Sequence, residues 1–151
     1  MNIPMTLPLD NGYLRRECPS CKRQFKWHHG PLDSSVDEGD AKEYFCPYCG
    51  QNAQTDSWWT EDQLKHAREL ATGESVKMIN DSMKGLERTM RGGLVSFEAN
   101  SMPVHEPHPL HEPQDMTAVQ SPCHPKEPMK ITEDWQDPVH CLICGKKFAI
   151  E

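Results

Sequence analysis

The sequence is short of apolar residues and has no long hydrophobic run. Apolar side chains make up 36% of the 151 residues and aromatic side chains 7%, whereas soluble domains contain about 45–50% apolar residues. The 13 prolines and a mean hydropathy of −0.77 agree with this. We therefore expect no single large core, and no stretch reaches the roughly 18 apolar residues of a membrane span.

The sequence also lacks a basic excess and a secretory signal. Its net charge of −7 argues against sequence-independent nucleic-acid binding, which relies on neutralising phosphates. Residues 1–12 show no basic segment followed by an apolar run, so we expect no signal peptide there, only a flexible tail. We therefore expect a cytoplasmic protein, in which clustered thiols more often bind metal than form disulfides.

Patterns typical of enzymes are missing as well. We find no His-Glu-x-x-His helix, no His-x-Glu with a following Pro-Cys-x-x-Cys, and no glycine-rich phosphate loop. No persuasive nucleophile–base set stands out either. The sequence therefore predicts a protein that is not an enzyme and has no small-molecule substrate.

What the sequence does contain is cysteine, seven in all. Cys18-Pro-Ser-Cys21 and Cys46-Pro-Tyr-Cys49 are two Cys-x-x-Cys loops, and 24 residues separate them. Each loop can place two thiolates on one side of a tight turn, and two such turns together close the tetrahedral four-sulfur cage that suits zinc. The alternative is one or two redox disulfides.

The residues around these loops, Glu17 to Lys22 and Tyr44 to Gly50, resemble the zinc-ribbon superfamily. The resemblance covers about a third of the chain. It implies short antiparallel strands between two turns called zinc knuckles, with Cys18, Cys21, Cys46 and Cys49 as ligands of one zinc ion. It does not imply a function, because zinc ribbons serve many.

The C-terminal segment looks like a degraded second copy. Ser121-Pro-Cys123-His124 aligns with the first loop, and Cys141-Leu-Ile-Cys144 aligns with the second. We therefore predict a second zinc site, for two zinc ions per chain. Its ligands would be Cys123, His124, Cys141 and Cys144.

Two alternatives for this copy stay open at the sequence level. Adjacent ligands need an unusual backbone, so His140 or a histidine of the linker could replace Cys123. Otherwise the segment is a metal-free remnant held by Ile131, Trp135 and Phe148.

Between the two copies we expect two helices. The first would run from Glu61 to about Ala71, with a capping box formed by Thr60 and Gln63. Thr72-Gly73 would end it, and the second would span residues 74–91 with apolar residues at spacings of 3, 4, 3 and 4. We call these residues the seam: Val76, Ile79, Met83, Leu86 and Met90. The seam either packs within the chain or pairs with a second copy or with another protein.

Residues 101–113 read as a linker rich in proline and histidine. The prolines favour an extended polyproline II conformation, in which His105, His108 and His111 would share one edge. A plain polar linker is favoured over a weak metal site there. Leu94–Phe97 could form a short strand. Further strands are expected at 13–17, 22–27, 116–119, 129–131 and 146–150.

Basic residues gather around the first Cys-x-x-Cys loop, opposed there only by Glu17, and an acidic loop at residues 33–40 follows. Either these side chains form a face for nucleic acid, or they cover the sulfurs and offset the anionic cage. They are Arg15, Arg16, Lys22, Arg23 and Lys26.

The sequence therefore predicts a small, metal-stabilised α+β protein. Its parts would be a tail (1–12), a zinc ribbon (13–59), a helical segment (60–100), a linker (101–113) and a degenerate ribbon (114–151). We expect a non-catalytic zinc-binding subunit or adaptor that docks on a larger protein partner or self-associates through the 74–91 helix. The alternative is a nucleic-acid-binding zinc ribbon.

Overall fold

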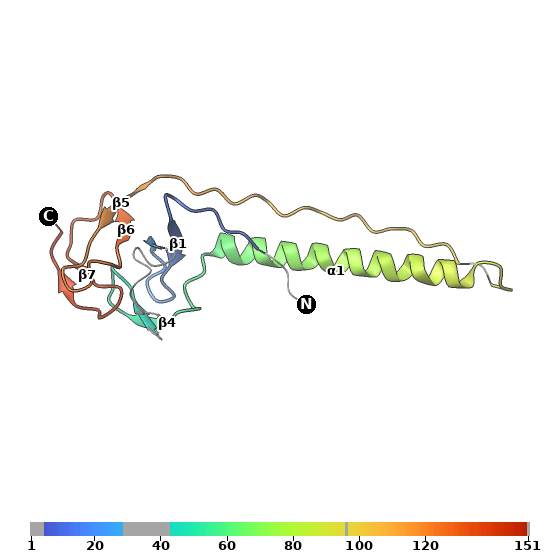
Figure 1. The fold of residues 1–151 in the computed structure, drawn as a ribbon, viewed down its shortest axis with the longest axis horizontal. Coiled ribbons are helices and arrows are strands. Elements are labelled where there is room, and N and C mark those ends of the chain that lie inside the picture. Colours follow the sequence, from blue (N-terminus) through green and yellow to red (C-terminus); the bar gives the residue numbers. More distant parts are fainter. Residues whose placement is uncertain (1–4, 29–42, 96, 151) are drawn as a thin grey trace. The chain divides into compact units, whose positions relative to one another are not determined.

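A computed structural model describes residues 5–28, 43–95 and 97–150 (Figure 1). The chain divides into two compact units. We call the unit of Leu7–Glu61 and His111–Glu151 the body. The other unit contains Met1–Thr6 and Asp62–Leu110, and we call Asp62–Leu110 the arm. The arm is thus an insertion between the two halves of the body. The acidic loop predicted at residues 33–40 lies outside the described residues.

Eight short strands lie in the described residues of the body. Strands β1 (Tyr13–Glu17) and β2 (Gln24–His28) form a hairpin around the first Cys-x-x-Cys loop, and β3 (Glu43–Phe45) and β4 (Asn52–Gln54) form one around the second. The C-terminal half repeats the arrangement with β5 (Met116–Val119) and β6 (Met129–Thr132), then β7 (Val139–His140) and β8 (Lys147–Phe148). The strands predicted at 13–17 and 116–119 are confirmed, and the other predicted strands of the body agree to within a few residues.

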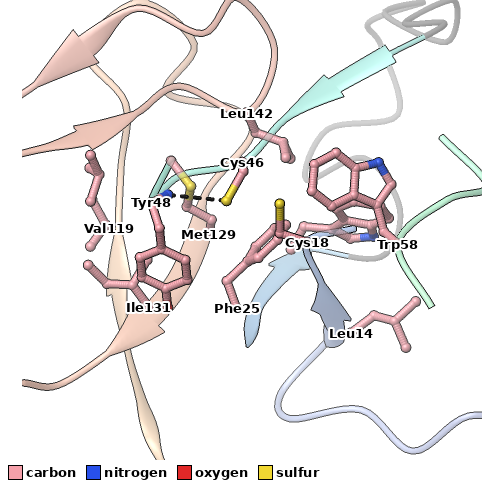
Figure 2. Close-up of a cluster of buried hydrophobic side chains, with 12 residues drawn as sticks. Leu14, Cys18, Phe25, Cys46, Tyr48, Trp58, Val119, Met129, Ile131 and Leu142 are labelled. Carbon is pink, nitrogen blue, oxygen red and sulfur yellow. Dashed lines mark hydrogen bonds between the residues drawn. The ribbon is translucent and has the colours of Figure 1, made fainter. Parts of the chain in front are cut away.

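The two halves of the body share one sheet and one core. Strand β2 pairs with β6, which gives a four-stranded antiparallel sheet of order β1-β2-β6-β5. Buried side chains of both halves, including Phe25, Trp58, Met129 and Leu142, form a single hydrophobic cluster (Figure 2). The two segments predicted as ribbon modules, 13–59 and 114–151, therefore fold together into one unit. Each half is too small to bury its own apolar residues, and pairing solves this for both.

A buried ion network joins the N-terminal residues to the segment that precedes β5. The Lys26 side chain has no exposed surface, and its Nζ lies 2.8 Å from a carboxylate oxygen of Asp10 and 2.9 Å from one of Glu112. The Asp10 carboxylate also accepts a hydrogen bond from Lys130 at 2.9 Å, and Arg15 pairs with Glu112 and Asp115. Asp10, which was predicted to lie in the tail (1–12), is therefore part of the body.

In its described residues, the arm consists of one helix and an extended segment, residues 97–110, which we call the return segment. Helix α1 (Glu61–Met90) runs through Thr72 and Gly73 without a break, so the prediction of two helices is wrong. An internal glycine costs a helix only about 1 kcal/mol, and the preceding Glu69, Leu70 and Ala71 are good helix formers. Thr60 and Gln63 are buried at its start, where the capping box was predicted. The strand predicted at Leu94–Phe97 does not form in the described part of that stretch.

The return segment runs back beside α1 (Figure 1). The Asn80 side chain exchanges two hydrogen bonds with the backbone of Met102, at 3.0 and 2.8 Å, and Glu69 accepts one from the His108 N–H at 2.9 Å. Gly73 faces this segment, where an added Cβ would lie 3.6 Å from the His105 carbonyl oxygen. Met102 and His108 of the predicted linker (101–113) are therefore bonded to α1, whereas Glu112 belongs to the body.

Candidate metal centres

The first Cys-x-x-Cys loop is a tight turn between β1 and β2. The Cys18 N–H donates to the Arg23 carbonyl at 3.0 Å, and the Lys22 N–H donates to the Cys18 carbonyl at 3.0 Å. The N–H groups of Ser20 and Cys21 point at the Cys18 sulfur, at 3.3 and 3.4 Å. Such backbone donors favour the thiolate form and fix its direction.

The second loop repeats this turn. The Cys46 N–H donates to the Gln51 carbonyl at 2.9 Å and the Gly50 N–H to the Cys46 carbonyl at 3.0 Å. The Tyr48 N–H points at the Cys46 sulfur at 3.4 Å (Figure 2). Gly50 has a φ of +74°, which glycine adopts without the strain that a Cβ would bring.

The two loops place four sulfur atoms at the spacing that a tetrahedral ion requires. The Sγ atoms of Cys18 and Cys49 are 3.7 Å apart, as are those of Cys21 and Cys46, and all four lie within 4.8 Å of one another. A tetrahedron of sulfurs at the zinc–sulfur distance of about 2.3 Å has edges of about 3.8 Å. Burial raises the pKa of the Cys46 thiol. Because burial disfavours the thiolate, deprotonated sulfurs at this spacing need a cation among them. We call these four residues cluster 1.

The C-terminal half forms a second group, which we call cluster 2. It consists of Cys123, His124, Cys141 and Cys144, whose ligand atoms also lie within 4.8 Å of one another. The Cys123 and Cys144 sulfurs are 3.3 Å apart, and the His124 Nδ1 lies 3.4 Å from the Cys141 sulfur. The local fold thus accommodates two adjacent donors, Cys123 and His124. The two clusters together use all seven cysteines.

The other histidines considered for cluster 2 lie elsewhere. The His140 Nδ1 is 3.2 Å from the Pro47 carbonyl oxygen. His108 lies against Glu69 within the arm. Among the described residues, only clusters 1 and 2 bring together three or more ligand atoms of histidine, cysteine or carboxylate side chains at this spacing.

Ser121 has a role that sequence analysis missed. It stands in the register position of Cys18 and is fully buried, as Cys18 nearly is. Its hydroxyl lies 2.9 Å from the Cys123 sulfur. This hydrogen bond is the main cause that lowers the pKa of the Cys123 thiol, to about 6. The alignment of Ser121 with Cys18 was the sequence signal from which this role could have been inferred.

The two second loops dock on each other with a pseudo-two-fold relation. The Phe45 N–H donates to the Leu142 carbonyl at 2.8 Å, and the equivalent His140 N–H donates to the Pro47 carbonyl at 2.9 Å. Each loop glycine also faces the partner loop. A Cβ on Gly50 would lie 2.9 Å from the His140 ring, and one on Gly145 would lie 2.6 Å from the Phe45 ring. The clusters therefore sit on two copies of one local fold in mutual contact.

The basic residues predicted as a nucleic-acid face do not form one face. Lys26 and Arg15 are held by carboxylates in the buried ion network. The Arg16 guanidinium is buried and lies over the rings of Trp27 and Trp59, at 4.7 and 5.0 Å. The two remaining residues, Lys22 and Arg23, are exposed, and Arg23 lies over the Trp135 ring. Nucleic-acid binding stays a prediction, without the continuous basic surface on which it rested.

The seam lies on α1 and is largely uncovered in the chain. Ile79 and Leu86 are both 47% exposed and Met83 is 36% exposed, whereas Val76 and Met90 are half-buried. Val76 lines a cavity of about 270 Å³ between α1 and the return segment. The return segment thus covers one flank of the helix and leaves the seam open.

No protein-family model, curated protein or solved structure matches this chain. Among the described residues, no helix combines the length and the apolar character that a membrane span requires.

Proposed function

We propose that this protein holds two zinc ions per chain as structural staples, one in each cluster. The observation that carries the proposal is the grouping of eight donor atoms into two sets, each within 4.8 Å. Sets of four sulfurs, or of three sulfurs and one imidazole, at tetrahedral spacing favour zinc over harder cations. A reducing compartment such as the cytoplasm keeps these thiols available.

The role of the ions is structural because each cluster supplies four protein donors. A tetrahedral ion so bound has no open position for water or substrate, which catalytic zinc needs. The strands of the body are short, two of them with two residues each. Zinc binding contributes on the order of 10 kcal/mol to the folding of such small domains.

Native mass spectrometry of protein purified without chelator tests this proposal. We expect two zinc ions per chain, and thermal unfolding of Cys46→Ser at a much lower temperature than wild type. Asp56→Asn, at an exposed position of the body, is the matched control and should unfold like wild type. A chain that carries no zinc, or an unchanged transition in Cys46→Ser, contradicts the proposal.

We further propose that the arm docks on a larger protein partner, so that the chain acts as an interaction subunit or adaptor. The partner element that fits is an amphipathic helix laid along the seam. The seam repeats at spacings of 3 and 4 over about two heptads, the pattern that receives another helix. One flank carries only small uncharged residues, at Ser75, Ser82 and Thr89, so a helix backbone can approach closely.

Site-specific photo-crosslinking tests the docking. A photoreactive residue at Met83 faces along the seam, whereas one at Asp81 lies on the opposite side of the helix and serves as the control. We expect a crosslinked larger protein from position 83 and none from 81, with the product lost in Ile79→Asp while both zinc ions stay bound. Equal products from both positions contradict the proposal, and a crosslinked dimer of this chain replaces it with self-association.

A further inference from the structure

The two clusters differ in how far their sulfurs are open to solvent. In cluster 2, Cys123 and Cys144 are both exposed, and their sulfurs are 3.3 Å apart. In cluster 1, Cys49 is exposed and Cys21 is half-buried, whereas Cys18 and Cys46 are buried. Cluster 2 therefore presents two exposed cysteines side by side, and cluster 1 presents one exposed and one half-buried cysteine.

Cys123 also lines a small surface cavity with a cationic wall. The cavity has a volume of about 190 Å³, and its lining includes Lys146, Lys147 and Phe148. A water-sized solute occupies about 30 Å³, so hydrogen peroxide fits beside the sulfur. The ammonium groups stabilise negative charge that develops on a leaving hydroxide.

We propose that Cys123 and Cys144 are a peroxide-sensitive pair, so that cluster 2 releases its zinc on oxidation while cluster 1 keeps its own. This inference rests on the proposed zinc sites. The Cys123 thiolate attacks one peroxide oxygen, the O–O bond breaks, and hydroxide leaves and is protonated to water. The resulting sulfenic acid is attacked by the Cys144 thiolate, the S–S bond forms and the second oxygen leaves as hydroxide. Peroxide is reduced by two electrons, and two thiolates are oxidised to one disulfide.

The oxidised pair cannot hold zinc, because metal ligation needs the thiolates themselves. Two of the four donors of cluster 2 are then lost, and His124 and Cys141 alone bind the ion weakly. In cluster 1 the buried Cys18 and Cys46, with 1% and 0% of their surface exposed, are shielded from the solute.

Stepwise peroxide treatment of the zinc-loaded full-length protein tests this. Released zinc is read with a chromogenic chelator, and the oxidised cysteines are identified by differential alkylation and peptide mass spectrometry. We expect an early phase that releases one ion per chain and forms the Cys123–Cys144 disulfide, well before cluster 1 reacts. In the variant with both Lys146→Glu and Lys147→Glu, the early phase should slow several-fold at unchanged zinc content.

The starting zinc count separates the two possible failures. If fewer than two ions are bound before oxidation, the proposed zinc sites fail. If two are bound but both leave at the same rate, or cluster 1 reacts first, the peroxide-sensitive pair is wrong. Early release with an unmodified Cys144 also overturns it.

Discussion

At the scale of single residues, the docking of the two second loops depends on glycine. Gly145 has a φ of +73°, and a Cβ there would lie 2.6 Å from the Phe45 ring. The left-handed conformation alone costs a residue other than glycine about 1–2 kcal/mol, and the overlap with the ring adds to this cost.

We therefore predict that Gly145→Ala lowers the thermal unfolding temperature of the zinc-loaded body. Gly92→Ala is the control, because Gly92 lies in the arm, with a φ of +87° and open space around it, and the variant should leave the unfolding of the body unchanged. An equal effect of the two variants would show that the docking contact adds nothing.

The Asp10 carboxylate accepts hydrogen bonds from two lysines of the buried network, Lys26 and Lys130. The hydrogen bond from Lys26 is the main cause that lowers the pKa of its carboxyl. Because the pKa of the folded state is depressed, the stability from ionised Asp10 is present above its unfolded pKa of about 4 and is lost only as pH falls below that value. Removing one partner of a buried ion pair costs about 3–5 kcal/mol.

We therefore predict that Asp10→Asn loses stability of this order, and that the gap to wild type stays constant from about pH 8 to pH 5.5. Denaturant unfolding of the zinc-loaded proteins across this range measures the gap. Asp137→Asn, at an exposed position, is the control and should show no gap. A gap that closes above pH 6 would mean that Asp10 is not held ionised by Lys26.

At the scale of elements, α1 is a long helix weakened by two internal glycines. Gly85 has no heavy atom within 4 Å of an added Cβ, apart from the helix's own backbone and its chain neighbours. Alanine there should stabilise the helix by about 1 kcal/mol.

We predict that Gly85→Ala raises the thermal midpoint of the arm, measured as helical circular dichroism, and leaves the zinc content unchanged. Gly73→Ala should raise the thermal midpoint less than Gly85→Ala, because its Cβ would contact the His105 carbonyl oxygen. A loss of helicity in Gly85→Ala would contradict this view of the helix.

The elements that sequence analysis predicted well are those set by local chemistry. The first Cys-x-x-Cys loop and the strands on both sides of it follow from turn residues and alternation within a few positions. The eight ligands are grouped as the sequence predicted, whereas β4 and β7 were not predicted. The helix break at Gly73 was wrong because one glycine is a weak signal in an otherwise helical stretch.

The parts that could not be predicted depend on residues far apart in the sequence. Lys26 sits between Phe25 and Trp27 on a strand and was interpreted as surface charge, because its partner Glu112 is 86 positions away. The pairing of β2 with β6 joins Trp27 to Met129. Local patterns carry no information about such pairings.

At the scale of the whole molecule, the shared sheet and core make the two halves of the body interdependent. Trp27 of β2 pairs with Met129 of β6, and Phe45 is bonded to Leu142. Disturbing one cluster should therefore loosen the other half, which independent modules on a linker would not do. We predict that Cys141→Ser, at the buried ligand of cluster 2, increases amide hydrogen exchange in β1 and β2 as well as in β5 to β8.

Hydrogen–deuterium exchange of the zinc-supplemented full chain measures this coupling, and Cys46→Ser provides the reciprocal test in β5 and β6. Asp137→Asn, at an exposed position beside β7, should leave exchange unchanged throughout. Coupling between two sites is reciprocal. Cys141→Ser must therefore raise exchange in the N-terminal half, and Cys46→Ser must raise it in the C-terminal half. Faster exchange confined to residues 114–151 in Cys141→Ser would mean that the N-terminal half is stable without its partner and that the shared sheet contributes little to it.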